Sequence, residues 1–211
     1  VGIAVAPDDG IDPDLLLKSA DMALYRAKAD GRGNYRFFEP GMDARAQARR
    51  ILELDLRAAL LRNEFEVYYQ PIYDLKTDKI NSFEALVRWN HPERGLIEPG
   101  DFIQIAEETG LIVPIGEWVL RRACTDAAGW SQEVGVAVNL SPAQFRNRNL
   151  VSSIFASLSA SGLPAKRLEL EITESVLLQD NETTLAALHR LRDFGVRISM
   201  DDFGTGYSSL S

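Results

Sequence analysis

The sequence has a single cysteine, no hydrophobic run of membrane-spanning length and fewer basic than acidic residues. One thiol, Cys124, cannot form a disulfide within the chain, which is typical of proteins from a reducing compartment. It lies in a helical pattern, Glu117–Trp130, and is expected to be a small core residue. No stretch approaches the roughly 20 apolar residues of a membrane helix, and no signal peptide is recognised. A cytoplasmic location is therefore expected, although upstream segments of a longer parent protein could supply a membrane anchor.

The charge balance is acidic, with 31 Asp and Glu residues against 23 Lys and Arg and a net charge of −8. This argues against a polymeric nucleic acid as partner, because phosphate backbones are bound by basic surfaces. An anionic ligand would need bound cations or a local basic cluster. The 45% of hydrophobic residues is ordinary for a globular chain that buries a core.

The first part of the chain, residues 1–39, shows two short strand patterns around one helix pattern. The apolar positions at helical spacing in it are Leu16, Ala20, Ala23, Leu24 and Ala27. About 40 residues cannot hold a core of their own, so this part is expected to be the tail of a larger domain. Residues 40–50 are expected to be a helical linker. The helix continues beyond them and is expected to pack on the next domain through Ile51, Leu54, Ala58 and Leu61.

From Phe65 onward, strand and helix patterns alternate. The first two strands are joined by the short segment Leu75–Asp78, which predicts a hairpin. Helices separate the later strands, which predicts parallel β–α–β crossovers. Asn139, Glu171 and Asp201 recur about 30 positions apart, the length of one such unit. They are therefore expected at equivalent places on successive strands.

Oxygen-bearing side chains interrupt or end four of these hydrophobic strands. They are Glu84, Asn139, Glu171, Glu174, Asp201 and Asp202. Acids at the mouth of a buried strand are costly unless a cation or another partner neutralises them. Carboxylate and amide oxygens are the ligands of hard cations such as Mg²⁺ or Mn²⁺. Since the C-terminal ends of barrel strands meet at one face, the sequence predicts a metal-dependent enzyme site there.

Alternation along each strand places these candidates on one face. Val136, Val138 and Leu140 share the opposite face of their strand, which is suited to packing under helices. Glu169 and Arg197, deeper on the candidates' face, are expected to form an ion pair.

Taken alone, each candidate has another interpretation. Glu84 or Glu171 could be an ordinary ion-pair partner, Asn139 could initiate a turn, and Asp201 could belong to a plain loop. Their recurrence at equivalent strand positions favours the metal site.

Six motifs then occur in order between residues 51 and 211: YYQPI, EALVRWNHP, FIQIAEETGLI, NLSP, LELEITES and DDFGTGYSSL. Together they resemble the EAL domain, a phosphodiesterase family that acts on cyclic dimeric GMP (cyclic di-GMP). Residues 1–39 resemble the C-terminal end of a GGDEF, or diguanylate cyclase, domain in GIAVAPDDG and ADMALYRAKADGRGNYRFF. The GGDEF signature itself does not occur, so no cyclase activity is inferred.

The resemblances imply an α/β fold class. A TIM-like (β/α)8 barrel of the EAL type, truncated after about five strands, would be preceded by a fragment of an α/β GGDEF domain. The expected parts are a GGDEF tail at 1–39, a helical linker at 40–50 and an incomplete EAL phosphodiesterase domain at 51–211.

The resemblance also implies a catalytic site with two Mg²⁺ or Mn²⁺ ions. Glu84, Asn139, Glu171 and Asp201 would ligate the first ion. Asp201 would bridge to the second ion, and Asp202 would join it there.

Four further residues match positions of the family's motifs. Glu174 resembles a catalytic-site glutamate that steadies the DDFGTGYSS loop. Gln70, Leu86 and Arg88 resemble ligand contacts, with Arg88 a donor to phosphate.

These matches imply that the parent protein hydrolyses cyclic di-GMP to linear pGpG in bacterial second-messenger signalling. It is expected to be a homodimer with an upstream sensor of unknown kind. Residues 1–211 alone are expected to be inactive, because the family's downstream lysine and glutamate lie beyond Ser211. The alternative is a catalytically silent EAL domain that serves as a cyclic di-GMP receptor. An enolase-like metal-dependent barrel is disfavoured by the combined motifs.

Overall fold

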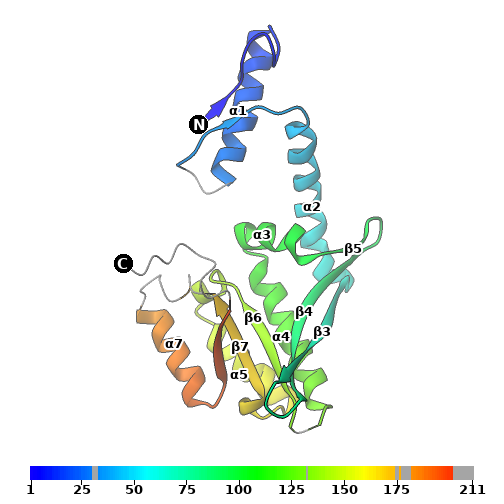
Figure 1. Ribbon diagram of the computed structural model, residues 1–211, viewed down its shortest axis with the longest axis vertical. Coiled ribbons are helices and arrows are strands. Elements are labelled where there is room, and N and C mark those ends of the chain that lie inside the picture. The colour runs from blue at the N-terminus through cyan, green and yellow to red at the C-terminus, as the bar shows by residue number, and fades with distance from the viewer. Residues whose placement is uncertain (30–32, 132, 174–175, 177–181, 202–211) are drawn as a thin grey trace. The chain divides into compact units, whose positions relative to one another are not determined.

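The computed structural model describes residues 1–29, 33–131, 133–173, 176 and 182–201 (Figure 1). The chain forms two compact units, Val1–Asp55 and Leu56–Ser211. In the described part of the chain, no helix has the length and apolar character that crossing a membrane requires.

The first unit pairs two short strands beside one helix. Strand β1 (Gly2–Ile3) lies parallel to β2 (Arg36–Phe37), and α1 (Pro13–Ala29) packs against them. A side chain at Gly2 would overlap the backbone of α1, which explains the glycine. The helix begins after Asp12, whose carboxylate accepts hydrogen bonds from the first backbone amides of the helix.

Two predictions for the first unit have different outcomes. The predicted apolar stripe of α1 faces inward, since Ala23 and Ala27 are buried and its other members are half-buried. The predicted first strand, Val1–Pro7, is too long. Val5 instead enters a turn with Asp9, whose side chain accepts a hydrogen bond from the Val5 amide at 2.7 Å.

Helix α2 (Met42–Arg62) does not bury the stripe that its sequence predicted. Of its four members, Ile51, Leu54 and Leu61 are exposed and Ala58 is half-buried. The buried positions are Leu52, Leu56 and Ala59. Both sets recur every three or four residues, so helical spacing does not distinguish them, and packing selects the second set.

The second unit is built on a sheet with the strand order β3-β4-β6-β7-β8 in the described residues. The strands are β3 (Phe65–Asp74), β4 (Lys79–His91), β5 (Gly95–Ile97), β6 (Gly135–Leu140), β7 (Leu168–Thr173) and β8 (Arg197–Asp201). Strands β3 and β4 form an antiparallel hairpin, whereas β4, β6, β7 and β8 are parallel neighbours. The predicted hairpin and parallel crossovers are confirmed. The short strand β5, which pairs antiparallel with β4, was not predicted.

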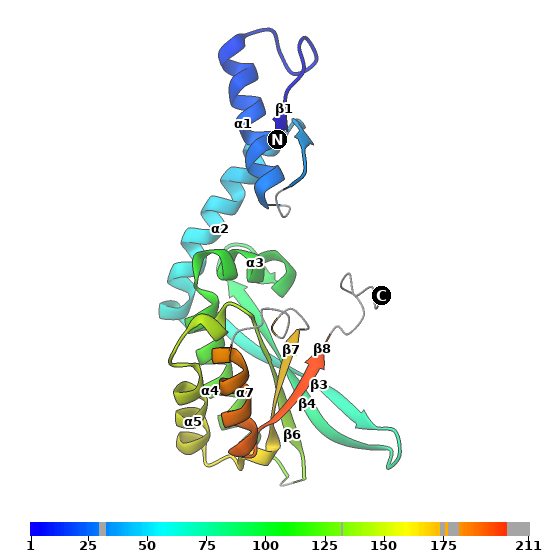
Figure 2. The same cartoon turned by 90° about the vertical axis from the view of Figure 1, so that its left-hand side faces the viewer.

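Helices connect the parallel strands and cover one face of the sheet. They are α3 (Pro99–Thr109), α4 (Ile112–Ala128), α5 (Leu150–Ser161) and α7 (Glu182–Asp193), with short 3-10 turns η1 (Gln144–Arg146) and η2 (Ala165–Arg167). Figure 2 shows α4, α5 and α7 on one side of the strands. Val136, Val138 and Leu140 are buried there, as predicted from the alternation along β6.

A buried arginine just before β7 links the end of α4 to the segment before β6 by hydrogen bonds. Arg167 is 6% exposed, and its guanidinium donates hydrogen bonds to three backbone carbonyls. The acceptors are Ala127 at 2.7 Å, Ser131 at 3.0 Å and Val134 at 2.9 Å. The end of α4, the loop after it and the start of β6 are thus fixed to the start of β7.

The single cysteine is a core residue, as predicted. Cys124 is fully buried in α4, and burial raises the pKa of its thiol to about 12. Because the thiolate is the reactive form, the folded protein should react with a thiol reagent at pH 8 far more slowly than the unfolded chain. We expect Cys124 to be labelled only after urea is added, as checked by mass spectrometry of the peptide that contains it. Rapid labelling without denaturant would contradict its burial.

Candidate functional site

The predicted site begins with a direct contact between two neighbouring strands. The Asn139 side-chain amide Nδ2 donates a hydrogen bond of 2.7 Å to Glu84 Oε1. The two residues are 55 positions apart, and the parallel pairing of β4 with β6 brings them together, since Glu84 lies opposite Ala137. The structure therefore joins two of the predicted ligands on one face of the sheet.

Glu84 does not lie at the end of its strand, which corrects the prediction. Strand β4 runs on to His91, but only Ser82–Ala85 pair with β6. Beyond Ala85 the strand leaves the parallel sheet and continues in the hairpin with β3 and β5. Glu84 thus lies at the end of the parallel portion, in the middle of a strand that hydropathy alone cannot divide.

The next candidates follow from the strand register. Glu171 lies directly opposite Asn139 on β7, and Ser199 lies opposite Glu171 on β8. The Asp201 backbone ends β8 opposite Thr173, two residues further along. The side chain of Asp201 lies outside the described residues.

Asp202 and Glu174 lie wholly outside the described residues. Within the described part of the chain, no group of three or more His, Cys, Asp or Glu side chains is close enough to hold a metal ion.

The donor set on this face fits a hard divalent cation. Because the Asn139 amide nitrogen bonds to Glu84, the amide oxygen of Asn139 is left to coordinate. The Glu171 carboxylate lies beside it in register. The buried Ser199 hydroxyl has no hydrogen-bond partner among the described residues, as is common where another polar group binds. Oxygen donors of this kind suit Mg²⁺ or Mn²⁺.

The predicted ligand contacts lie on the β3–β4 hairpin, on the same face as Glu84. Cross-strand pairing places Gln70 opposite Glu84 and Tyr68 opposite Leu86. Arg88 follows two positions later, so alternation gives Glu84, Leu86 and Arg88 a common face. The hairpin therefore presents an arginine on the same face as Glu84, four residues further along β4.

Comparison with known proteins identifies this arrangement. Residues 53–211 match the EAL domain family. The chain belongs to the EAL domain family.

A protein of Sinorhizobium fredii, y4lL, is 54% identical over the whole chain, which covers 26% of that protein. MucR of Pseudomonas aeruginosa, a bifunctional diguanylate cyclase/cyclic di-GMP phosphodiesterase, is 46% identical, again over the whole chain, which covers 31% of MucR. The structure of the MucR phosphodiesterase in complex with cyclic di-GMP aligns with 75% of this chain and 66% of that one, at 45% identity and a TM-score of 0.71. The chain thus spans about a quarter to a third of the length of these relatives.

The EAL domain contains the predicted ion pair on the same face, two residues before Glu171 on β7 and two residues before Ser199 on β8. Arg197 Nη2 lies 3.3 Å from Glu169 Oε2, and the two residues are direct neighbours on β8 and β7. A side chain at Gly135 would approach the Arg197 guanidinium to 2.9 Å. The glycine therefore leaves room for this pair, which is structural.

Sequence reasoning missed the network that fixes the turn after Asn139. Ser141 Oγ donates a hydrogen bond of 2.5 Å to Glu107 Oε1 on α3, and the Ser141 backbone amide donates to the buried Gln144 side chain at 3.0 Å. A side chain at Gly116 would overlap the Gln144 side-chain amide, so a larger residue there would displace Gln144 from this network. Ser141 and Glu107 lie in the NLSP and AEETG motifs, but nothing in their spacing indicates that they touch.

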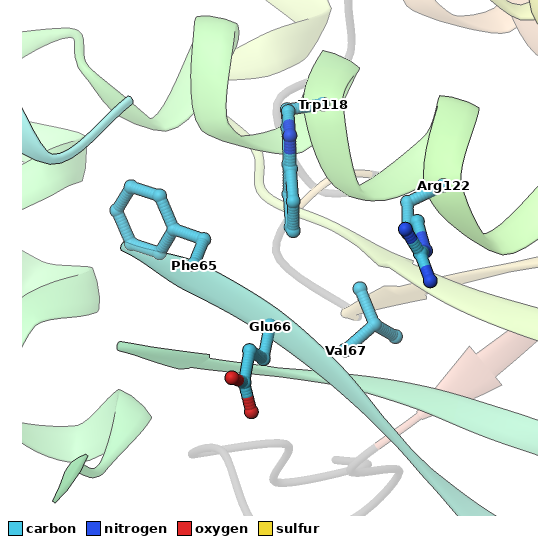
Figure 3. Close-up of a pocket in the computed structure, with 5 residues that line it drawn as sticks. All are labelled: Phe65, Glu66, Val67, Trp118 and Arg122. Atoms are coloured by element: carbon cyan, nitrogen blue, oxygen red, sulfur yellow. The ribbon is translucent and has the colours of Figure 1, made fainter. Parts of the chain in front are cut away.

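A hollow elsewhere on the EAL domain does not coincide with this site. It has a volume of about 310 Å³ and lies between β3 and α4 (Figure 3). Trp118, Val67 and Arg122 lie on one side of β3, while Glu66 points to the other side. Arg122 is already engaged with Asp126 at 2.8 Å. The hollow therefore lacks the converging polar groups of a catalytic centre.

Proposed function

We propose that the protein to which this EAL domain belongs hydrolyses cyclic di-GMP to linear pGpG with the help of divalent cations. The observation that carries the proposal is the Asn139–Glu84 hydrogen bond, with Glu171 in register beside it and Arg88 on the same face. The names of the relatives support it, since MucR is described as a cyclic di-GMP phosphodiesterase and its structure holds cyclic di-GMP.

Glu84, Asn139 and Glu171 would hold the first Mg²⁺ or Mn²⁺ ion, and Asp201 would bridge to a second ion held also by Asp202. Such a pair of ions lowers the pKa of the attacking water and neutralises charge on the phosphate. The hydrogen bond from Asn139 orients the Glu84 carboxylate and would leave its other lone pairs available to a cation.

The other predicted residues have roles in binding the substrate. Arg88 would donate hydrogen bonds to a phosphate oxygen of the cyclic dinucleotide. Gln70 and Leu86 would contact the ligand on either side of Glu84, since the hairpin register puts both near it. Glu174 would steady the loop after β8.

We also propose that the second unit is part of a TIM-like (β/α)8 barrel and that residues 1–39 are the tail of a GGDEF domain. The run of parallel strands β4, β6, β7 and β8 supports the first statement. The match of the whole chain, residues 1–39 included, to a bifunctional diguanylate cyclase/phosphodiesterase supports the second. Four points stay predictions: the homodimer, the upstream sensor, the cytoplasmic location and the division of the chain at 1–39, 40–50 and 51–211.

The intact protein should convert cyclic di-GMP to linear pGpG when Mg²⁺ or Mn²⁺ is supplied, and chelation by EDTA should stop the reaction. Chromatography of the nucleotides before and after incubation measures this conversion. Binding of cyclic di-GMP without hydrolysis at saturating metal would contradict the proposal and favour the silent receptor.

A further inference from the structure

The arginine that would receive the phosphate is already held by a carboxylate. Arg88 Nε lies 3.2 Å from Glu98 Oε2. Another guanidinium nitrogen of Arg88 donates to the backbone carbonyl of Val87 at 2.9 Å. The Tyr68 ring lies along the same guanidinium, with its centroid 5.5 Å from Cζ. Two guanidinium nitrogens are thus engaged within the EAL domain itself.

The short strand β5 brings Glu98 to this position. Ile97, its last residue, is buried and pairs with Trp89, the neighbour of Arg88 on β4. Glu98 follows in an extended conformation and precedes α3, but its side chain makes no capping hydrogen bond to that helix. The Glu98 carboxylate therefore pairs with Arg88 and does not cap the start of α3.

The two partners differ in exposure. The Arg88 side chain is 17% exposed, whereas that of Glu98 is 61% exposed. The arginine is held in place by the sheet and the Tyr68 ring, while the glutamate is free to turn into solvent. An incoming anion would thus displace Glu98 and leave Arg88 in position.

We propose that Glu98 sets the affinity of this EAL domain for cyclic di-GMP by competing with its phosphate for Arg88. Carboxylate and phosphate oxygens accept hydrogen bonds from the same guanidinium donors, so a phosphate that binds at Arg88 Nε must displace Glu98. The negative charge of Glu98 also opposes the approach of the ligand. The inference rests on the proposed function, because it requires a phosphate at Arg88.

The test is a steady-state comparison of the intact protein with its Glu98→Gln variant. The KM for cyclic di-GMP should fall about two- to fivefold, which is the upper part of the range measured for exposed ion pairs, with kcat nearly unchanged. The difference should shrink as ionic strength rises, because salt screens partly exposed charges. An unchanged or higher KM in the variant would overturn the proposal.

Two controls separate competition at Arg88 from a general effect of charge. Glu93→Gln removes the same charge from an exposed position in the turn between β4 and β5, and should leave KM unchanged. In an Arg88→Ala background, Glu98→Gln should change KM by less than about twofold, since the pair no longer exists. An equal fall in KM with Glu93→Gln, or one that persists without Arg88, would contradict the competition. If the unmodified protein does not hydrolyse cyclic di-GMP, the proposed function fails by itself, before Glu98 is tested.

Discussion

Replacing Glu84 with alanine should lower kcat/KM for cyclic di-GMP by at least about 100-fold in the intact protein, because a ligand of the proposed metal site is lost. The fold should survive. Glu84 is only half-buried, and its partner Asn139 is exposed and can bond to water instead. Removing a carboxylate from the face that also carries Glu171 relieves repulsion, so the melting temperature should stay the same or rise.

The measurement is a titration of activity with Mg²⁺ and with Mn²⁺, accompanied by thermal unfolding of both proteins. Glu93→Ala, which removes an exposed carboxylate from the turn after β4, is the matched control and should retain full activity. Near-normal turnover of the Glu84→Ala variant at saturating metal would show that Glu84 does not ligate the ion.

Replacing Arg167 with methionine should lower the free energy of unfolding by about 3 kcal/mol or more, since three charge-assisted hydrogen bonds are lost. The carbonyls of Ala127, Ser131 and Val134 would be left without this donor at the base of the helix layer. The melting temperature should fall by roughly 6–12 °C, as a loss of this size produces in domains of about 150–250 residues.

Differential scanning calorimetry of the intact protein measures this change, and hydrogen exchange should show lost protection at the end of α4 and the start of β6. Lys166→Met provides the control, because it removes a neighbouring positive charge from an exposed side chain. An equal effect of the two substitutions would mean that the three hydrogen bonds contribute little.

Much of the second unit could be predicted because apolar residues recur in its strands and helices at the regular spacing of each element. The alternation in β7 separated the faces correctly, and the Glu169–Arg197 ion pair followed from it, whereas in β6 Gly135 and Ala137 on the other face are buried as well. Period alone failed in α2, where two apolar stripes are equally regular and only packing distinguishes them. The three residues of β5 are too few for any period to show.

The site could be predicted in part for the same reason. Glu84, Asn139 and Glu171 were assigned together from their strands, and the structure places them side by side in register or hydrogen-bonded. Glu98 could not be found, because its contact with Arg88 depends on the pairing of β5 with β4. The roles of Asp201, Asp202 and Glu174 stay predictions.

The two halves of the proposed site differ in how far apart their residues lie along the chain. Gln70, Glu84 and Arg88 belong to one hairpin, which closes through a turn of a few residues and forms by local contacts. Asn139 joins Glu84 only across 55 positions, a segment that includes α3 and α4. Contacts between residues so far apart in sequence form slowly, because the chain loses entropy on closing the loop before the contact contributes any stabilising free energy. During synthesis on the ribosome, the hairpin that carries Gln70, Glu84 and Arg88 should therefore begin to form before the oxygen donors of β6 and β7 reach it.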